Sequence, residues 1–307
     1  MKKKLNPYSE LKEFAIYKIS SHLKKVSASL RPCVETENPS AIHDFRISTR
    51  KFIASCELFN RYLESKNLLY LKKQLCMLSS STGSVRDLDI SKIYLKKLLK
   101  EKPLNLKGSF IKAILKKIRQ KRNKKFKKEI KKDIVALIRA KLCKGLINQF
   151  KVRKQKSTLE NPENILLIKK LVAIKLRRYL NEFYQYRFFL DESINQDDLH
   201  KARIILKTIR YTLEEIAGFC DLKIRNFINN ITELQHQLGL IHDCDVVLNY
   251  LLRLSKTKKL VDSKDILDLI QFIKKDRILK YKETIRFLNK IMPAGFDKKL
   301  LTSLNPV

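Results

Sequence analysis

Residues able to bind a chain of phosphate groups recur at helical spacing in the segment IHDFRISTRKF, residues 42–52. His43, Arg46 and Arg50 are three and four residues apart, so an α-helix would place them on one face, and Lys51 follows directly. Arginine binds phosphate oxygens through paired hydrogen bonds, and lysine supplies a point charge. The spacing predicts a basic stripe suited to a polyanion, with salt bridges between helices as the alternative use.

The same arrangement returns 157 residues later in the segment DLHKARIILKTIRY, residues 198–211. His200, Arg203 and Lys207 keep the spacing of the first stripe, and Arg210 adds a cation on the same side. Two copies of one pattern are harder to explain by incidental salt bridges than one copy. We therefore interpret both stripes as anion-binding faces.

A second motif is also duplicated, as GSVRDLD in residues 83–89 and GLIHDCD in residues 239–245. Arg86 and His242 occupy equivalent positions and complete the expected anion ligands. The paired aspartates of each copy cannot share a helix face, so one is expected to orient a stripe arginine, with a helix cap or surface ion pair as an equal alternative. These candidate orienting residues are Asp87, Asp89, Asp243 and Asp245. The glycines predict a helix break or a close helix approach.

Both stripe histidines, His43 and His200, are expected in the first turn of their helices. Ser40 and Asp197 lie three residues before them, and both residue types are favoured N-caps. Free N–H groups and the helix dipole attract anions at this end. The cations deeper in each helix would extend the anion site along its face.

A catalytic alternative comes from His242-Asp243, with His200 upstream. Metal-dependent phosphohydrolases of the HD type are all-helical and use histidines and aspartates in such an order. The equivalent of His242 in the first copy is Arg86, which is not a metal ligand, so the position favours anion binding. The sequence contains no P-loop, H-E-x-x-H or G-x-S-x-G motif. We expect no catalytic residues, metal or cofactor.

The composition predicts an all-α protein with a polyanionic partner. The 307 residues include 67 Lys or Arg against 31 Asp or Glu, a net charge of +36, and few glycines and prolines. Scarce turn residues with frequent Leu, Ile, Lys and Glu favour helices. Such an excess of positive charge on a chain that is 44% hydrophobic indicates nucleic acid, an acidic membrane surface or polyphosphate as partner.

The nearly equal offsets of the two motifs indicate two copies of one unit, residues 1–155 and 156–307. Apolar spacing predicts about four helices in each copy. The expected helices span residues 8–30, 41–63, 68–100, 109–150, 162–190, 198–219, 223–255 and 263–288. The polar segment 151–164 is the expected junction.

Residues 112–132 hold twelve Lys or Arg and one Glu, and they offer a second basic surface. A buried seam is predicted from Ala113, Ile114, Leu115, Ile118, Phe126 and Ile130. The outer face of this helix could be merely solvated, or it could bind RNA, DNA or acidic lipid. Phe126 is its only ring for base stacking, which weighs against single-strand binding.

The six cysteines form no C-x-x-C pair and lie mostly among apolar neighbours, so they are expected to be reduced core residues of a cytosolic protein. The basic start of the chain has no apolar stretch after it, and no apolar run approaches the ~20 residues of a membrane span. We expect a cytoplasmic protein without a transmembrane segment.

The duplicated motifs resemble those of the CHAD family, the conserved histidine α-helical domain. The likeness covers about residues 8–289 and departs at His242, where the family usually has arginine. It implies two four-helix bundles related by a pseudo-two-fold axis, with a basic channel between them. It also implies non-catalytic binding of inorganic polyphosphate in the cytoplasm, where polyphosphate granules are a candidate location.

The residues expected to bind polyphosphate form two walls. They are His43, Arg46, Arg50, Lys51 and Arg86 on one wall, and His200, Arg203, Lys207, Arg210 and His242 on the other. Nucleic acid bound to the basic surface of residues 112–132 remains the alternative partner.

Overall fold

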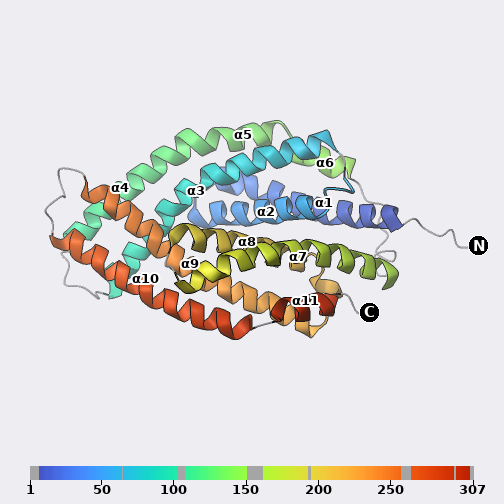
Figure 1. The fold of residues 1–307 in the computed structure, drawn as a ribbon. Helices are drawn as coiled ribbons and strands as arrows, with labels where there is room; N and C mark the ends of the chain where they lie inside the picture. Colours follow the sequence, from blue (N-terminus) through green and yellow to red (C-terminus); the bar gives the residue numbers. More distant parts are fainter. Residues whose placement is uncertain are drawn as a thin grey trace, which may run out of the picture.

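The structure is a computed structural model that describes residues 7–63, 65–101, 108–150, 162–192, 195–256, 264–293 and 295–304, without the side chains of residues 7–9 and 187–192. The described residues form helices joined by turns and short loops, with no strand among them. Most helices run along the length of an elongated molecule (Figure 1). The predicted all-α fold is confirmed.

The first half consists of three long helices followed by four shorter segments. These are α1 (Pro7–Glu35), α2 (Pro39–Leu58), α3 (Lys66–Glu101), α4 (Gly108–Lys125), η1 (Phe126–Ile130), α5 (Lys131–Arg139) and α6 (Leu142–Gln149). The prediction of one helix over residues 109–150 is wrong. The π-helical η1 interrupts it, and so does Lys141, whose φ of 52° lies in the left-handed region.

The spacing of the buried residues explains the π-helical turn. Five buried side chains lie at multiples of four residues: Ile114, Ile118, Phe126, Ile130 and Ile134. Each step of four residues turns an α-helix about 40° beyond a full turn, so the apolar stripe would rotate away from the core. The wider π-helical turn corrects this drift. Within the predicted seam, Ala113 is exposed and Leu115 only half-buried.

The second half contains four long helices and two short ones. These are α7 (Pro162–Glu192), α8 (Gln196–Glu214), the 3-10 helix η2 (Ala217–Phe219), α9 (Leu222–Ser255), α10 (Lys264–Ile291) and α11 (Phe296–Leu304). The long helices follow the predicted ranges, whereas α11 was not expected because it is short and follows Pro293 and Gly295. It packs on α7 and α9 through buried Phe296 and Leu300. Most of the predicted junction, residues 151–161, lies outside the described residues.

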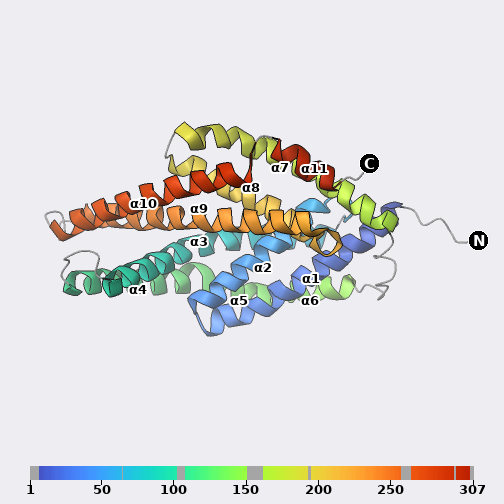
Figure 2. The same cartoon turned by 90° about the horizontal axis from the view of Figure 1, so that it is seen from below.

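Consecutive long helices pack on one another within each half. In the first half α1 lies on α2, α2 on α3 and α3 on α4, and in the second α7 lies on α8, α8 on α9 and α9 on α10. The halves meet where α2 lies beside α8, α3 beside α9 and α1 beside α7. Figure 2 shows α9 and α10 next to α3 and α4 toward one end of the molecule. The helices that carry the stripes, α2 and α8, are therefore neighbours.

One apolar cluster joins the two halves. It includes Phe45 and Phe52 from α2 and Leu206 and Ile209 from α8, all 0% exposed. A second cluster lies where α3, α4, α9 and α10 meet. Fully burying a side chain of this size contributes roughly 1.5–3 kcal/mol, so packing between the halves stabilises both.

The cysteines belong to this interior, as predicted. Five of the six are buried, Cys76 is half-buried, and all are free thiols. Burial raises the pKa of Cys56 and of Cys244 to about 12. Such thiols stay protonated and unreactive at neutral pH.

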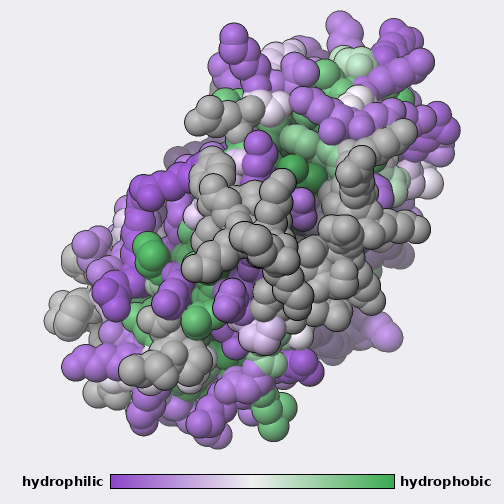
Figure 3. Space-filling view, turned by 90° about the vertical axis from the view of Figure 1, so that its right-hand side faces the viewer, coloured by the Kyte–Doolittle hydropathy of each residue, from purple (hydrophilic) through white to green (hydrophobic). Residues whose placement is uncertain are grey.

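The surface at the end near α1, α7 and α11 is largely hydrophilic. Small hydrophobic areas lie between the hydrophilic residues on this face (Figure 3). None of the described helices combines the length and the hydrophobicity needed to cross a bilayer.

Candidate functional site

An asparagine caps each stripe-bearing helix. The Asn38 side chain accepts a hydrogen bond from the Ser40 N–H at 3.1 Å, and Asn195 accepts one from the Asp197 N–H at 3.0 Å. The prediction of Ser40 and Asp197 as caps is therefore wrong, because the asparagines two residues earlier take this role. Each stripe histidine is the fifth residue of its helix. The histidines thus lie beyond the free N–H groups of the first turn, and an anion beside them would meet their side chains.

The two stripes face one cavity of about 730 Å³ between α2, α3, α8 and α9. Eight of the ten expected anion ligands line it: His43, Arg46, Arg50, Arg86, His200, Arg203, Lys207 and His242. Two expected orienting residues, Asp87 and Asp243, also line it. Positive side chains outnumber carboxylates on these walls, so the cavity attracts anions.

Lys51 and Arg210 do not line this cavity, and both are paired with one acid. Lys51 Nζ lies 2.7 Å from Glu214 Oε2, and Arg210 Nε lies 3.5 Å from Glu214 Oε1. Both cations also lie over the ring of Tyr211, which lines the cavity. Each keeps further N–H donors, but Glu214 would compete with an anionic ligand for both cations.

The two motif glycines leave room for the stripe arginines. A Cβ placed on Gly83 would lie 3.8 Å from Arg46 Nη1, and one placed on Gly239 would lie 3.5 Å from Arg203 Nη2. Both are ordinary van der Waals distances, so an alanine would fit against the guanidinium groups without displacing them. The expected helix break is absent, since α3 and α9 continue through both glycines, and the atoms nearest to each glycine belong to a stripe arginine rather than to another helix backbone.

The two arginines are held differently. Arg46 Nη1 donates hydrogen bonds to the Ser79 carbonyl oxygen and, at 2.7 Å, to Thr82 Oγ1. Leu238 occupies the equivalent of Thr82 in the second motif. The buried Nε of Arg203 has no hydrogen-bond partner among the described residues. The Arg203 guanidinium is therefore held by fewer hydrogen bonds than that of Arg46.

One aspartate of each motif lies near a stripe arginine. Burial raises the pKa of Asp87 and of Asp243, and the positive charges of Arg46 and Arg203, respectively, oppose that rise. The structure thus brings each of these carboxylates near the arginine that it was expected to orient.

The other aspartate of the first motif, Asp89, contacts α4 rather than a stripe arginine. Asp89 is buried and accepts a hydrogen bond from Arg122 Nε of α4 at 3.2 Å. Arg122 Nη2 also donates to the Glu37 carbonyl oxygen at 2.5 Å, immediately before the cap of α2. Through Arg122, Asp89 helps to fix the start of the helix that carries the first stripe.

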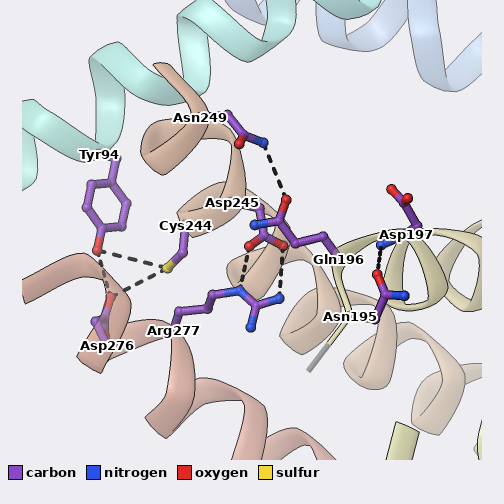
Figure 4. A network of polar contacts seen from close by, with 9 residues as sticks. All are labelled: Tyr94, Asn195, Gln196, Asp197, Cys244, Asp245, Asn249, Asp276 and Arg277. Carbon is purple, nitrogen blue, oxygen red and sulfur yellow. Dashed lines mark hydrogen bonds and ion pairs between the residues drawn. The ribbon is translucent and has the colours of Figure 1, made fainter. Parts of the chain in front are cut away.

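Asp245 has the corresponding position in the second half (Figure 4). It accepts a hydrogen bond from Arg277 Nε of α10 at 2.5 Å. Gln196, the first residue of α8, donates a hydrogen bond to the same carboxylate and receives one from Asn249 of α9 at 3.4 Å. Asp245 therefore positions the start of the second stripe helix. Neither Asp89 nor Asp245 lines the cavity.

Comparison with known proteins agrees with this arrangement. The sequence model of the CHAD domain family matches residues 18–252, which contain both stripes and both glycine motifs. The chain belongs to the CHAD domain family. No curated protein matches it in sequence.

Two solved structures share the fold of this CHAD domain. The crystal structure of the CHAD domain from the plant Ricinus communis covers 97% of this chain and 92% of its own, with a TM-score of 0.57 and 15% identity. PptA from Streptomyces chartreusis covers 91% of this chain and 98% of its own, with a TM-score of 0.61 and 12% identity. At these identities the likeness concerns the fold, and the site must be argued from its own residues.

Several positively charged side chains lie close together in the cavity of this CHAD domain, where they are partly shielded from water. Burial, followed by the charges of Arg203 and Arg50, lowers the pKa of Lys207 to about 6. Burial and the Arg50 charge lower that of Arg46 to about 10. A bound anion would oppose these shifts, so binding is coupled to proton uptake.

The histidines are also shifted toward their neutral forms. Burial lowers the pKa of His43, of His200 and, to about 3, of His242, and nearby arginines add to each shift. The His200 and His242 ring centroids are 5.2 Å apart. A neutral imidazole can donate one hydrogen bond to a phosphate oxygen. In the described part of the chain, no group of three or more His, Cys, Asp or Glu side chains is arranged to hold a metal ion.

Sequence reasoning missed several polar lining residues, among them Gln235, His236 and Glu57. Gln235 Nε2 donates a 2.6 Å hydrogen bond to the Leu206 carbonyl oxygen and so ties α9 to α8. It lies four residues before its motif glycine, as Ser79 does in the first half, where Ser79 contacts a stripe arginine. Alignment of the two copies could have identified this position.

Proposed function

We propose that this CHAD domain protein binds inorganic polyphosphate in the cavity between α2, α3, α8 and α9 and catalyses no reaction on it. The observation that carries the proposal is the convergence of two basic stripes, 157 residues apart in sequence, on one cavity. A surface that only needs solvation would not gather its cations in a partly buried space, where each like charge is costly without an anion.

Binding would be multivalent. Successive phosphates would meet Arg46 and Arg50 on α2 and Arg203 and Lys207 on α8. Each hydrogen bond to a charged group contributes about 1.5–3 kcal/mol, and the arginine fork matches two phosphate oxygens. Release of condensed counterions from the chain adds to affinity and makes it dependent on salt.

The duplicated architecture belongs to the same proposal. Residues 1–155 and 156–307 would be two four-helix repeats related by a pseudo-two-fold axis, in a cytoplasmic protein. Support comes from recurring contacts: an asparagine caps each stripe helix, and a buried aspartate–arginine pair follows each glycine motif.

Binding of RNA or DNA to the outer face of α4 is the second candidate, because the lysines there are exposed. They include Lys112, Lys116, Lys117, Lys124, Lys127 and Lys128, the last two in η1. Phe126, the only aromatic residue of this segment, is 0% exposed and cannot stack on a base. The cavity therefore has the stronger support.

Competition between two polyanions tests the proposal. Labelled long-chain polyphosphate is bound to the purified protein, and unlabelled polyphosphate or tRNA is added at equal phosphate concentration. We expect unlabelled polyphosphate to displace the label at a much lower concentration than tRNA does. Equal displacement would contradict selective binding in the cavity, and no binding of polyphosphate would overturn the proposal.

A further inference from the structure

A second, smaller cavity adjoins the main cavity on the side of α4. It measures about 260 Å³, lies between α3, α4 and α9, and shares Asp87 and His242 with the main cavity. Three cations line it: Lys121, Lys125 and Arg253. The two cavities are therefore adjacent, with Asp87 and His242 bordering both.

The charges at the two ends of the main cavity differ. On the α1 side, a cavity of about 210 Å³ shares Tyr211 with the main cavity. Two of its three lysines are paired with acids, since Lys51 lies 2.7 Å from Glu214 and Lys18 lies 3.7 Å from Glu215, and Lys25 is the third. On the α4 side, Asp87 is the only carboxylate among the lining residues.

Two lysines of α4, Lys121 and Lys125, border the second cavity. Lys121 Nζ lies 5.8 Å from the centre of the Tyr250 ring on α9. Lys125 is half-buried, and its charge opposes the burial-driven rise in the pKa of Asp87. Lys121 is exposed, in agreement with the expected basic outer face, and it differs from the exposed Lys117 and Lys124 of the same helix in that those two line neither cavity.

We propose that Lys121, Lys125 and Arg253 form a second phosphate-binding site for a polyphosphate chain that extends out of the main cavity past Asp87 and His242. This inference rests on the proposed function of the main cavity. It assigns a direction to the bound chain, because two acids pair with lysines at the α1 end, whereas the α4 end presents three cations beside the single carboxylate of Asp87. Short oligophosphates would fill the main cavity alone.

A comparison of chain lengths tests this site. The double variant Lys125→Gln, Arg253→Gln is measured with tripolyphosphate and with long-chain polyphosphate. We expect about a tenfold loss of affinity for the long chain, as for about 1.4 kcal/mol, and less than about a twofold change for tripolyphosphate. Each phosphate contact on a single-stranded nucleic acid adds ~0.7 to the steepness of log affinity against log salt. By analogy, the loss of two contacts should make this plot about 1.4 less steep for the long chain.

The matched control is Lys117→Gln, Lys124→Gln, which removes the same charge from exposed positions of α4. It should weaken long-chain binding only slightly. Equal losses in the two double variants, or an equal loss for short and long chains, would overturn the second site. If wild-type protein binds neither ligand, the main-cavity proposal fails instead. The wild-type protein provides a test that needs no substitution. If its affinity for tripolyphosphate and for the long chain depends equally on salt, an extended site is contradicted.

Discussion

Lys51 of α2 and Glu214 of α8 form an ion pair across the two halves, with 2.7 Å between Lys51 Nζ and Glu214 Oε2. The same carboxylate lies 3.5 Å from Arg210 Nε. One acid therefore engages the two stripe cations that do not line the main cavity. Because anionic ligands would compete with this acid, Glu214 limits how many stripe cations are available for binding.

Replacing Glu214 by Gln should strengthen polyphosphate binding. The substitution releases Lys51 and Arg210 beside Tyr211. A partly exposed charge pair is worth up to ~1 kcal/mol, and the variant also loses the repulsion between Glu214 and the anionic ligand. We therefore expect a three- to tenfold gain in affinity, measured by titration calorimetry. Glu283→Gln removes the same charge from an exposed position of α10 and should change affinity little. Equal gains would show that only net charge matters.

Reversing one arginine in each stripe should nearly abolish binding. Arg46→Glu with Arg203→Glu removes two charge-assisted contacts of roughly 1.5–3 kcal/mol each and adds repulsion inside the cavity. We expect a loss of at least about a hundredfold in affinity for polyphosphate. Circular dichroism must first show that the variant is folded.

The exposed pair Lys117→Glu, Lys124→Glu serves as the control for that experiment. It lowers the net charge from +36 to +32, as the arginine pair does, so long-range attraction changes similarly. Exposed charges are screened within about 8–10 Å, so only a few-fold loss is expected. A larger loss from the lysine pair would move the site to the outer face of α4 and favour nucleic acid as the ligand.

Affinity should rise as the pH falls from 8 toward 6, because of Lys207. Its pKa in the free protein is about 6, and a bound phosphate would return it toward the ordinary value of 10.5. At a pH between these two pKa values, Lys207 is protonated in the bound state and neutral in the free protein. Affinity therefore rises by at most about tenfold for each unit of pH decrease and levels off below pH 6. Titration calorimetry in buffers of different ionisation enthalpy measures the proton uptake directly.

Lys207→Arg is the matched variant for the pH experiment. Arginine stays protonated, so the pH dependence between 6 and 8 should flatten. His43 and His200 add to the dependence only toward its acid end, because their pKa values in the free protein lie below the ordinary value. A wild-type affinity that is constant from pH 6 to pH 8 would contradict the role of Lys207.

Asp245→Asn should lower stability. The substitution weakens the buried pair with Arg277 and the contact that positions Gln196 at the start of α8. Breaking a buried ion pair costs about 3–5 kcal/mol, so the thermal midpoint should fall by several degrees. Asp243→Asn, in a carboxylate that faces the cavity, should leave the midpoint closer to that of the wild type. Equal midpoints for wild type and Asp245→Asn would contradict the structural role.

The all-α fold and most of the site could be predicted because their signals are local. His43, Arg46 and Arg50 share a face by helical spacing alone, and the duplicated pattern indicated which face mattered. The ion pair of Lys51 could not be predicted, because its partner, Glu214, is 163 positions away in the sequence. Periodicity can show that a cation lies near a stripe, but it cannot show which acid lies opposite.

The aspartates and the basic segment illustrate the same limit. Asp89 and Asp87 are indistinguishable by type and spacing, yet one meets Arg122 of α4 and the other faces the cavity. Lys121 and Lys124 are similarly alike in sequence, but α4 packs so that only Lys121 meets α9. The π-helical turn was missed because a four-residue apolar spacing is compatible with an α-helix over a short stretch.

The apolar cluster shared by the two halves bears on how such proteins can be recombined. Side chains of α2 and α8 pack into one interior, so each half is shaped to the other as well as to itself. A chimera that joins the first half of this chain to the second half of a relative only 12–15% identical would pair unrelated packing surfaces. Such a chimera should aggregate or fold poorly even with every basic residue retained, whereas exchange of cavity-lining side chains alone should be tolerated.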